Sequence, residues 1–235
     1  MLPTNKTNNL AKRTLDVVVA FLMIIALLPI FLLVALVVRF DSSGPLFYRQ
    51  VRVGRDGSLF EIWKFRTMRH KNDLQGPSVT SSDDCRITNV GKYLRHWKLD
   101  ELPQLFNVLT GDMSLVGPRP QVPHFVDQFE PKLRTIVLRV RPGITGPTAL
   151  EFRHEETMLA DKPDRESYYI QHLLPVKLKM DVDYVQSSCM RGDLRILTKT
   201  VWLISVDPIK RIVLKRRAVR MLKSGSETRV PSYLP

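Results

Sequence analysis

The sequence predicts a mainly helical α+β protein that is held at a membrane by its N-terminal segment. Three observations lead to this fold class. Residues 17–38 are 22 consecutive positions without a charge, which is long enough for a membrane segment. Residues 45–68 carry two runs rich in β-branched and aromatic residues around the turn sequence GRDG, as in a β-hairpin. Most of the remaining chain spaces its apolar residues as helices do.

Composition narrows the classes of partner. The 235 residues include 36 Lys and Arg against 23 Asp and Glu, which gives a formal net charge of +13. Such a charge favours an anionic partner: nucleic acid, an acidic membrane surface or phosphorylated small molecules. The two cysteines, Cys85 and Cys189, have no metal-ligand spacing, so a disulfide framework or a structural zinc site is not expected.

The apolar run has the length of a membrane helix but contains a proline. A straight helix of this length would extend about 33 Å, and a bilayer core is roughly 30 Å thick. Arg39 and Asp41 follow directly, which does not fit a cleaved signal peptide. Pro29 divides the run into two halves of about 18 and 15 Å, each too short to span. Two topologies remain, a kinked span and a helix-break-helix that re-enters the same face.

The charges that flank the run favour re-entrance, because positive residues mark the cytoplasmic side of a membrane. Both flanks are basic, with Lys6, Lys12 and Arg13 before the run and Arg39, Arg49, Arg52 and Arg55 after it. A hairpin that breaks at Pro29 and keeps both ends in the cytoplasm is therefore predicted, with the kinked span as the alternative.

Several elements are expected after the β-hairpin. Residues 70–86 form a polar loop, one helix starts at Thr88, and a second runs from Leu102 to Leu109 and ends at Gly111. The stretches SLVGPRPQVP and RPGITGP contain too much Gly and Pro for regular structure. Further helices are predicted over residues 125–140 with an interruption near Pro131, over 164–190 and over 193–206.

The chain divides into a membrane hairpin over residues 1–40, a cytoplasmic domain over 41–206 and a basic tail over 207–235. Residues 209–225 of the tail mix seven basic residues with apolar ones, which predicts an amphipathic helix lying on an anionic membrane. Each Lys or Arg near such a surface contributes about 1 kcal/mol. A nucleic-acid contact and a solvated helix are the alternatives for this tail.

Candidate chemistry begins in KLDELPQ, where Asp100 and Glu101 stand side by side. Adjacent helical residues point about 100° apart, so the two carboxylates cannot share a proton. They can divide the work, one at a reacting centre and the other on a hard cation such as Mg²⁺. Alternatively the pair only begins a helix, since acids suit a first turn and Pro103 is tolerated there.

Cations in rigid, proline-rich or aromatic surroundings predict a diphosphate site around this pair. Arginine binds phosphate oxygens bidentately, and rigid turns reduce the entropy lost on binding. The candidate ligands are Lys64, Arg66, Arg95, Arg119 and Arg141. The chain has no Walker A, GxGxxG or GxSxG motif, and its five histidines show no metal-ligand spacing.

A series of segments in fixed order resembles the bacterial sugar transferase family, the small monotopic phosphoglycosyl transferases. The segments are KRTLDVVVAF, GPLFYRQVRVGRDGSLFEIWKFRTM, RITNVGKYLRHWKLDELPQLFNVLTGDMSLVGPRP, RPGITG and RGDLRILTKTV, and they cover roughly residues 11–206. The resemblance implies transfer of a sugar 1-phosphate from a UDP-sugar to undecaprenyl phosphate, with release of UMP. This would be the first membrane step in the assembly of exopolysaccharide, lipopolysaccharide or glycoprotein glycans.

The resemblance also implies roles for individual residues. Asp100 matches the family's nucleophile, which forms a covalent phosphosugar intermediate, and Glu101 matches its Mg²⁺ ligand. Arg119 would contact the nucleotide or phosphate, with Arg95 and Arg141 beside it. Asp193, in RGDLRI, matches a characteristic acidic position and is expected as a second metal ligand.

The expected location is the cytoplasmic face of the bacterial inner membrane, with the protein inserted as a monotopic hairpin. An anionic membrane, undecaprenyl phosphate and downstream glycosyltransferases are the expected partners, and the apolar run argues against nucleic acid. A non-enzymatic membrane-surface interaction protein is the alternative function. After RPGITG the chain reads PTALEFRHEE where many members have an LAQ-like sequence. The sequence thus leaves open the identity of the sugar and whether the protein forms a homodimer.

Overall fold

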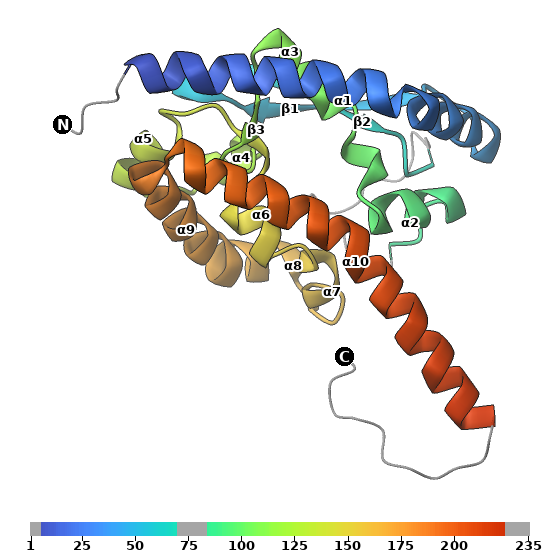
Figure 1. The fold of residues 1–235 in the computed structure, drawn as a ribbon. Helices are drawn as coiled ribbons and strands as arrows, with labels where there is room; N and C mark the ends of the chain where they lie inside the picture. The colour runs from blue at the N-terminus through green and yellow to red at the C-terminus, as the bar shows by residue number, and fades with distance from the viewer. Residues whose placement is uncertain (1–5, 70–83, 224–235) are drawn as a thin grey trace.

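The computed structural model of the chain describes the backbone of residues 6–69 and 84–223, and the side chains of residues 10–69 and 84–206. The fold is mainly helical α+β, with a long apolar N-terminal helix and two small sheets, as Figure 1 shows. The predicted polar loop lies largely outside the described residues, as do the side chains of the basic tail.

Helix α1 (Lys6–Asp41) is 36 residues long and continues through Pro29. Proline removes one backbone donor and bends a helix, and Figure 1 shows that α1 changes direction along its length. The predicted break at Pro29 is therefore not an interruption of the helix. By length and composition, Leu10–Asp41 could cross a membrane.

One face of α1 packs on the rest of the protein, and another apolar face is open. Ala20, Val34 and Val38 are buried, and the Phe31 ring lies 5.7 Å from that of Phe65. The open face carries large apolar side chains, among them Phe21, Leu22, Ile25, Leu28, Leu32, Leu33, Leu36 and Phe40. A face of this size marks a protein or membrane contact.

The predicted β-hairpin is confirmed. Strands β1 (Phe47–Val53) and β2 (Leu59–Phe65) pair antiparallel, with Phe47 opposite Phe65. A 3₁₀ turn, Arg55–Gly57, joins them and holds Asp56 at a φ of 56°.

The next two helices also follow the prediction. Thr88 caps helix α2 (Asn89–His96) by accepting a hydrogen bond from the Gly91 amide. A 3₁₀ turn over Leu99–Glu101 leads into α3 (Gln104–Thr110), which ends at Gly111 with a φ of 99°. Glycine adopts this left-handed conformation without steric cost.

The expectation that the two Gly- and Pro-rich stretches are irregular throughout is wrong, because each contains a three-residue strand. Strand β3 (Ser114–Val116) pairs parallel with β4 (Gly143–Thr145). The two backbones approach closely, since a Cβ on Gly143 would lie 2.1 Å from the Gly117 nitrogen. Glycine permits the pairing by having no side chain.

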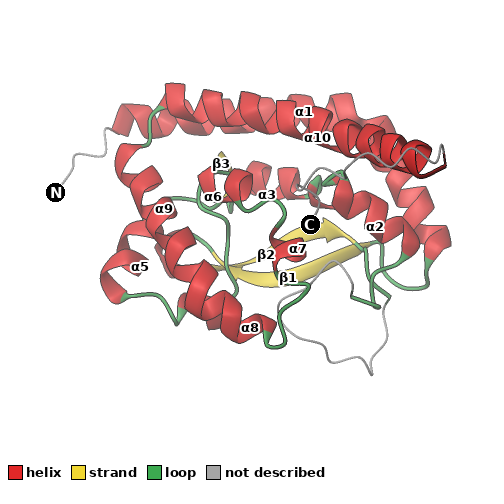
Figure 2. Cartoon of the chain, turned by 90° about the horizontal axis from the view of Figure 1, so that it is seen from below, coloured by secondary structure: helices red, strands yellow, loops and turns green. Residues whose placement is uncertain are grey.

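The chain after β3 is helical apart from β4, and part of it packs against β1, since Val53 shares a buried apolar cluster with Phe125 and Val126. The helices of this part are α4 (Pro123–Val126), α5 (Pro131–Val137), α6 (Pro147–Glu151), α7 (Glu155–Met158), α8 (Arg165–Tyr168), a π-helical turn (Tyr169–Leu173), α9 (Leu174–Ser187) and α10 (Met190–Lys223). The gap between α4 and α5 is the predicted interruption near Pro131. Helix α10 continues past residue 206 without a break. In Figure 2 it runs along the same side of the molecule as α1.

The close approach of β3 and β4 gives a stability test. Gly143→Ala should lower the thermal unfolding midpoint by at least about 2 °C, because overpacking costs roughly 1–3 kcal/mol and these backbone atoms cannot move aside. Gly192→Ala is the control, since its Cβ would meet only the Cys189 sulfur, at 3.5 Å. Equal midpoints for the two variants would contradict the pairing.

Candidate active site

Asp100 lies in the 3₁₀ turn between α2 and α3, and the backbone positions it unusually. Lys98, which begins this turn, has a φ of 56°, a left-handed conformation that is uncommon for a side chain of this size. The Asp100 carboxylate is buried, and its Oδ1 has no hydrogen-bond partner among the described residues. Burial raises the pKa of Asp100, and the nearby Lys64 ammonium opposes this rise. A buried oxygen without a partner costs free energy and is typical of a site that binds something.

Glu101, the neighbouring carboxylate, is held by two cations. Arg119 donates to it twice, from Nη2 to Oε1 at 2.5 Å and from Nη1 to Oε2 at 3.2 Å. The Lys64 ammonium donates to Oε1 at 2.9 Å. Burial alone would raise the pKa of Glu101, but Arg119 and Lys64 hold it well below its usual range. Glu101 is therefore ionised, and it does not cap α3, whose N-cap is Pro103.

The cations come from two separate parts of the chain. Lys64 projects from β2, and burial lowers its pKa. Arg119 comes from the turn after β3, and the charge of Glu101 raises its pKa. The Glu101 carboxylate thus joins the β-hairpin, the Leu99–Glu101 turn and the GPRP segment.

Arg52 belongs to this group, although sequence reasoning did not select it. Its Nη1 donates to the Pro120 carbonyl at 3.0 Å, and its Nη2 donates to Gln50 at 2.6 Å. Burial and the neighbouring Arg119 lower the pKa of Arg52 to about 10. The alternation of side chains along the strand could have identified Arg52. Tyr48 is directly opposite Lys64, and residues 48 and 52 lie on the same face of the strand, so Arg52 lies on the face that carries Lys64.

Gln104 was also missed. The side chain is fully buried, and neither its Oε1 nor its Nε2 has a partner within the described part of the chain. Residues four apart on a helix are neighbours, so the spacing from Asp100 was a signal in the sequence. Its two unpartnered groups are a buried donor and a buried acceptor four residues along the chain from Asp100.

The structure does not bring Arg66 or Arg141 to this group. The Arg66 guanidinium donates to the carbonyls of Pro45, Val38 and Ser42, where α1 ends. Arg141 donates from Nε to the Gly111 carbonyl at 2.7 Å, where α3 ends. Both arginines neutralise the negative ends of helices.

Arg95 and Asp193 have partners of their own. Arg95 pairs with Glu156 at 2.8 Å and is close enough to Asp100 for its charge to act on that carboxylate. Asp193 accepts a hydrogen bond from the Tyr184 hydroxyl at 2.7 Å and one from Lys12 at 2.5 Å. Asp193 therefore belongs to the contact between α10 and α1.

The Asp100–Glu101 pair carries oxygen donors of the kind that magnesium binds, although both Glu101 oxygens already accept hydrogen bonds from Lys64 and Arg119. Magnesium is bound by one or two carboxylates, with substrate phosphates and water completing its shell. The unpartnered oxygen of Asp100 and the ionised Glu101 supply such hard oxygen donors. Among the described residues, no three His, Cys, Asp or Glu side chains gather as a metal site.

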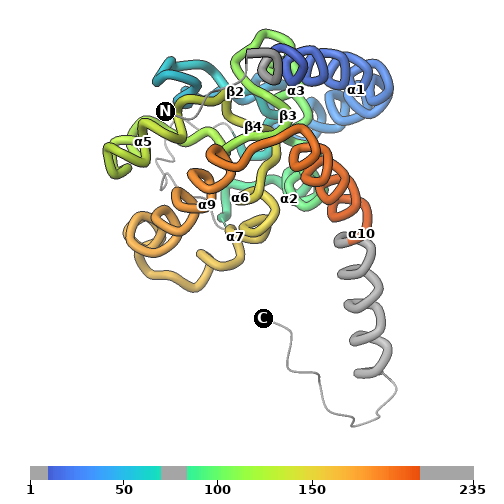
Figure 3. The backbone as a smooth tube through the Cα atoms, turned by 60° about the vertical axis from the view of Figure 1, so that its left-hand side comes forward, coloured from blue at the N-terminus to red at the C-terminus, as the bar shows by residue number. Residues whose placement is uncertain are grey.

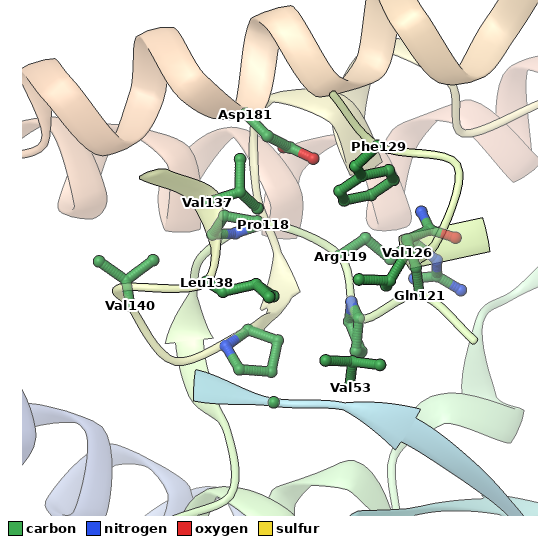
Figure 4. A pocket seen from close by; sticks show the side chains of 13 residues that line it. Val53, Pro118, Arg119, Gln121, Val126, Phe129, Val137, Leu138, Val140 and Asp181 are labelled. Atoms are coloured by element: carbon green, nitrogen blue, oxygen red, sulfur yellow. The ribbon is translucent and has the colours of Figure 1, made fainter. Parts of the chain in front are cut away.

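A small cavity of about 20 Å³ adjoins Arg119. Figure 4 shows Asp181 entering from the helix on one side, Val53 lying on the strand opposite, and Arg119 and Gln121 beside them. Asp181 accepts a hydrogen bond from the Thr148 hydroxyl at 2.9 Å. Burial raises the pKa of Asp181 to about 7.

Comparison with known proteins gives one family. The bacterial sugar transferase family matches residues 7–207. A UDP-glucose:undecaprenyl-phosphate glucose-1-phosphate transferase from Klebsiella pneumoniae is 37% identical over 202 residues, 85% of this chain and 41% of that protein. A protein with the same description from Caulobacter vibrioides is 39% identical over 197 residues, 82% of this chain and 69% of that protein.

The exopolysaccharide production protein ExoY of Sinorhizobium fredii is 36% identical over 207 residues, 82% of this chain and 84% of that protein. The chain therefore spans about two fifths of the Klebsiella protein and most of the ExoY protein.

The buried Asp181 gives a pH-dependent test. Unfolded Asp ionises near pH 3.9, whereas folded Asp181 keeps its proton to about pH 7. Its contribution to stability is thus complete below about pH 4 and is lost as the pH rises towards 7, up to roughly 4 kcal/mol.

Asp181→Asn cannot ionise, so it should be more stable than the wild type at pH 8, and this advantage should vanish at pH 4. Thermal unfolding at both pH values measures the difference. Asp183→Asn, an exposed position on the same helix, should show no such trend. An Asp181→Asn advantage that is equal at both pH values would refute the raised pKa.

Proposed function

This chain belongs to the bacterial sugar transferase family, and from that premise we propose that it transfers a sugar 1-phosphate from a UDP-sugar to undecaprenyl phosphate. The products are undecaprenyl-diphosphate-sugar and UMP. The relatives' descriptions name a UDP-sugar and undecaprenyl phosphate. The residues of this chain support the same chemistry independently of those names.

The observation that carries the proposal is the imbalance of charge around Asp100. Three cations, Lys64, Arg52 and Arg119, lie in one group with two carboxylates, the ion-paired Glu101 and Asp100 itself. An additional anion would satisfy this group, and a diphosphate has the charge and the oxygens to do so. Cations held in a poorly hydrated site also stabilise charge that develops during phosphoryl transfer.

Asp100 is the proposed nucleophile. One carboxylate oxygen would attack the sugar-bearing phosphorus, forming an acyl phosphate as the bond to UMP breaks and UMP leaves with the electron pair. A phosphate oxygen of undecaprenyl phosphate would then attack the same phosphorus and release Asp100. Two displacements replace one difficult exchange. Bound Mg²⁺ would neutralise phosphate charge beside Glu101.

Three groups support the carboxylate in this role. Lys64 favours its ionised form against the effect of burial. Arg119 and Lys64 together fix the neighbouring Glu101. The buried amide of Gln104, which lacks a partner in the described structure, lies one helical turn from Asp100 and can position a phosphate oxygen.

The membrane attachment is proposed to be a re-entrant hairpin at the cytoplasmic face of the inner membrane. Near its start, α1 is bonded to the globular part through Arg13 and Asp16, which contact the Val108 carbonyl and the Leu115 amide. Near its end, the Val38 carbonyl accepts a hydrogen bond from Arg66. Because both ends are bonded to one globular body, that body and both ends are expected on the same side of the membrane.

The nucleophile is tested with protein in nanodiscs, Mg²⁺, undecaprenyl phosphate and a panel of UDP-sugars. Wild-type protein should release UMP and, without the lipid, gain the mass of one phosphosugar. Asp100→Asn should lose the adduct and at least about a thousandfold of the rate.

Asp127→Asn makes the same chemical change at an exposed surface residue and should retain activity. UMP release that survives Asp100→Asn would show that another group is the nucleophile. No UMP with any donor would instead favour a non-enzymatic membrane-surface protein.

The topology is tested by labelling single cysteines at Leu10 and Ser43, which are exposed at either end of α1. The native Cys85 and Cys189, also exposed, are first replaced by Ser. A membrane-impermeant maleimide should label both positions in inverted vesicles and neither in intact spheroplasts. Labelling of the two positions from opposite sides would establish the kinked span.

A further inference from the structure

The proposed phosphate ligand Arg119 lies in a short, stiff stretch of backbone. We call residues 117–121, which read GPRPQ, the Arg119 segment. Pro118 and Pro120 fix their own φ angles, and each also restricts the residue before it. Because few backbone torsions between the two ends can change, the positions of the ends decide where Arg119 lies and how its guanidinium meets Glu101.

Packing against α9 does not hold the middle of this segment. Helix α9 packs beside α5 and α6, as Figure 3 shows. Between α9 and the segment lies the cavity of about 20 Å³, with Asp181 on one side and Pro118 and Arg119 on the other (Figure 4). Atoms that line a void lose the contacts that a neighbouring atom would provide. On the side of α9, the segment is therefore held by hydrogen bonds at its ends.

Backbone hydrogen bonds join both ends to the neighbouring strands. The Gly117 amide donates to the Thr145 carbonyl of β4 at 2.9 Å, and the Gln121 carbonyl accepts from the Val53 amide of β1 at 3.0 Å. Neither bond involves α9 or the π-helical turn that precedes it. Two tyrosine hydroxyls make the connection to that helix and turn.

Tyr169 contacts the last residue of the segment. It begins the π-helical turn, a rare geometry that often occurs at functional sites. Its hydroxyl lies 3.3 Å from the Lys177 ammonium and 3.2 Å from Gln121 Oε1. An ammonium can only donate, so the hydroxyl accepts from Lys177 and donates its own proton to Gln121. Burial raises the pKa of Tyr169, so this proton is retained.

Tyr184 of α9 contacts the residue directly before the segment. Its hydroxyl lies 3.2 Å from the Val116 carbonyl and 2.7 Å from Asp193 Oδ1, and its one proton is shared between them. Lys12 of α1 donates to the same carbonyl at 3.1 Å and to the other Asp193 oxygen at 2.5 Å. Burial raises the pKa of Tyr184 too. Asp193 thus brings two donors together at the carbonyl where the Arg119 segment begins.

We infer that Tyr169 and Tyr184 are positioning residues for the transfer reaction, each fixing one end of the Arg119 segment so that Arg119 meets the phosphate in the correct orientation. The inference rests on the proposed function, in which Arg119 binds the diphosphate. Both tyrosines are buried, and they act through residues 116 and 121 without touching the substrate. A misplacement of about 1 Å can cost about a hundredfold in rate, so such hydroxyls can control the reaction.

The test removes each hydroxyl alone. Full-length Tyr169→Phe and Tyr184→Phe proteins in nanodiscs are assayed for UMP release with undecaprenyl phosphate and the UDP-sugar that the wild type uses. Each variant should lower kcat/KM at least about tenfold, and the double variant at least about fiftyfold. Each thermal unfolding midpoint should fall by no more than about 4 °C, because one hydrogen bond contributes little to stability.

Tyr168→Phe is the matched control. It makes the same change at the adjacent residue, whose ring lies against Lys162 and His172, and it should keep kcat/KM within about twofold of the wild type.

Two further variants show whether the tyrosines act through the Arg119 segment. Arg119→Lys keeps the charge but loses the planar guanidinium, so in this background each Tyr→Phe change should cost less than about twofold. The slow rates are followed by the mass of the phosphosugar adduct formed without lipid. Gln121→Met removes the acceptor of the Tyr169 hydroxyl. It should cost about as much as Tyr169→Phe, and the two together should cost no more than either alone.

These outcomes separate positioning from general stability and from the reaction itself. If the Tyr→Phe losses are as large in the Arg119→Lys background as in the wild type, the tyrosines do not act through Arg119 and the inference is overturned, while the proposed function stands. Full activity of both Phe variants would overturn it as well. If no donor releases UMP from wild-type protein, the proposed function fails, and the inference fails with it.

Discussion

The ion pairing of Glu101 is the interaction on which the rest of the structure depends. One buried carboxylate receives Arg119 from the segment after β3 and Lys64 from the β-hairpin. Three chain segments that are far apart in sequence are thereby fixed around Asp100. Removing one member of such a group would leave a buried charge uncompensated, a large cost. The same contacts leave Glu101 ionised and place positive charge beside a carboxylate whose own burial resists ionisation.

Local signals in the sequence were reliable where short-range physics decides the structure. The hairpin turn, the Thr88 cap and the Gly111 stop depend on neighbouring residues, and the structure has all three. The parallel pairing of β3 with β4 was not predicted. Strands of three residues show no periodicity, and their glycines serve a backbone contact across 26 positions of sequence.

The chemical character of the site could be predicted from the sequence, but not all of the residues that form it. Sequence reasoning found Asp100, Glu101, Lys64 and Arg119, which the structure brings together. It also selected Arg66 and Arg141, which bind the ends of helices. An arginine next to a proline or an aromatic residue has the same sequence context whether it binds phosphate or a helix end. The direction in which the guanidinium points decides between these roles, and that direction depends on tertiary packing. Gln104 and Arg52 were missed for the opposite reason, since their spacing was visible but neither residue is a typical catalytic group.

The contact between Arg13 and the end of α3 makes the length of that helix important for the position of Asp100. The guanidinium of Arg13 binds the Val108 and Leu109 carbonyls at one end of α3, and the Asp100 turn precedes the other end. Seven residues of α-helix measure about 10 Å, so the helix sets the distance between the Arg13 contact and the Asp100 turn. One inserted residue would add only about 1.5 Å but would rotate the turn by about 100°. The distance from Arg13 and the orientation of the Asp100 turn are therefore coupled, and the length of α3 can change only by about whole turns.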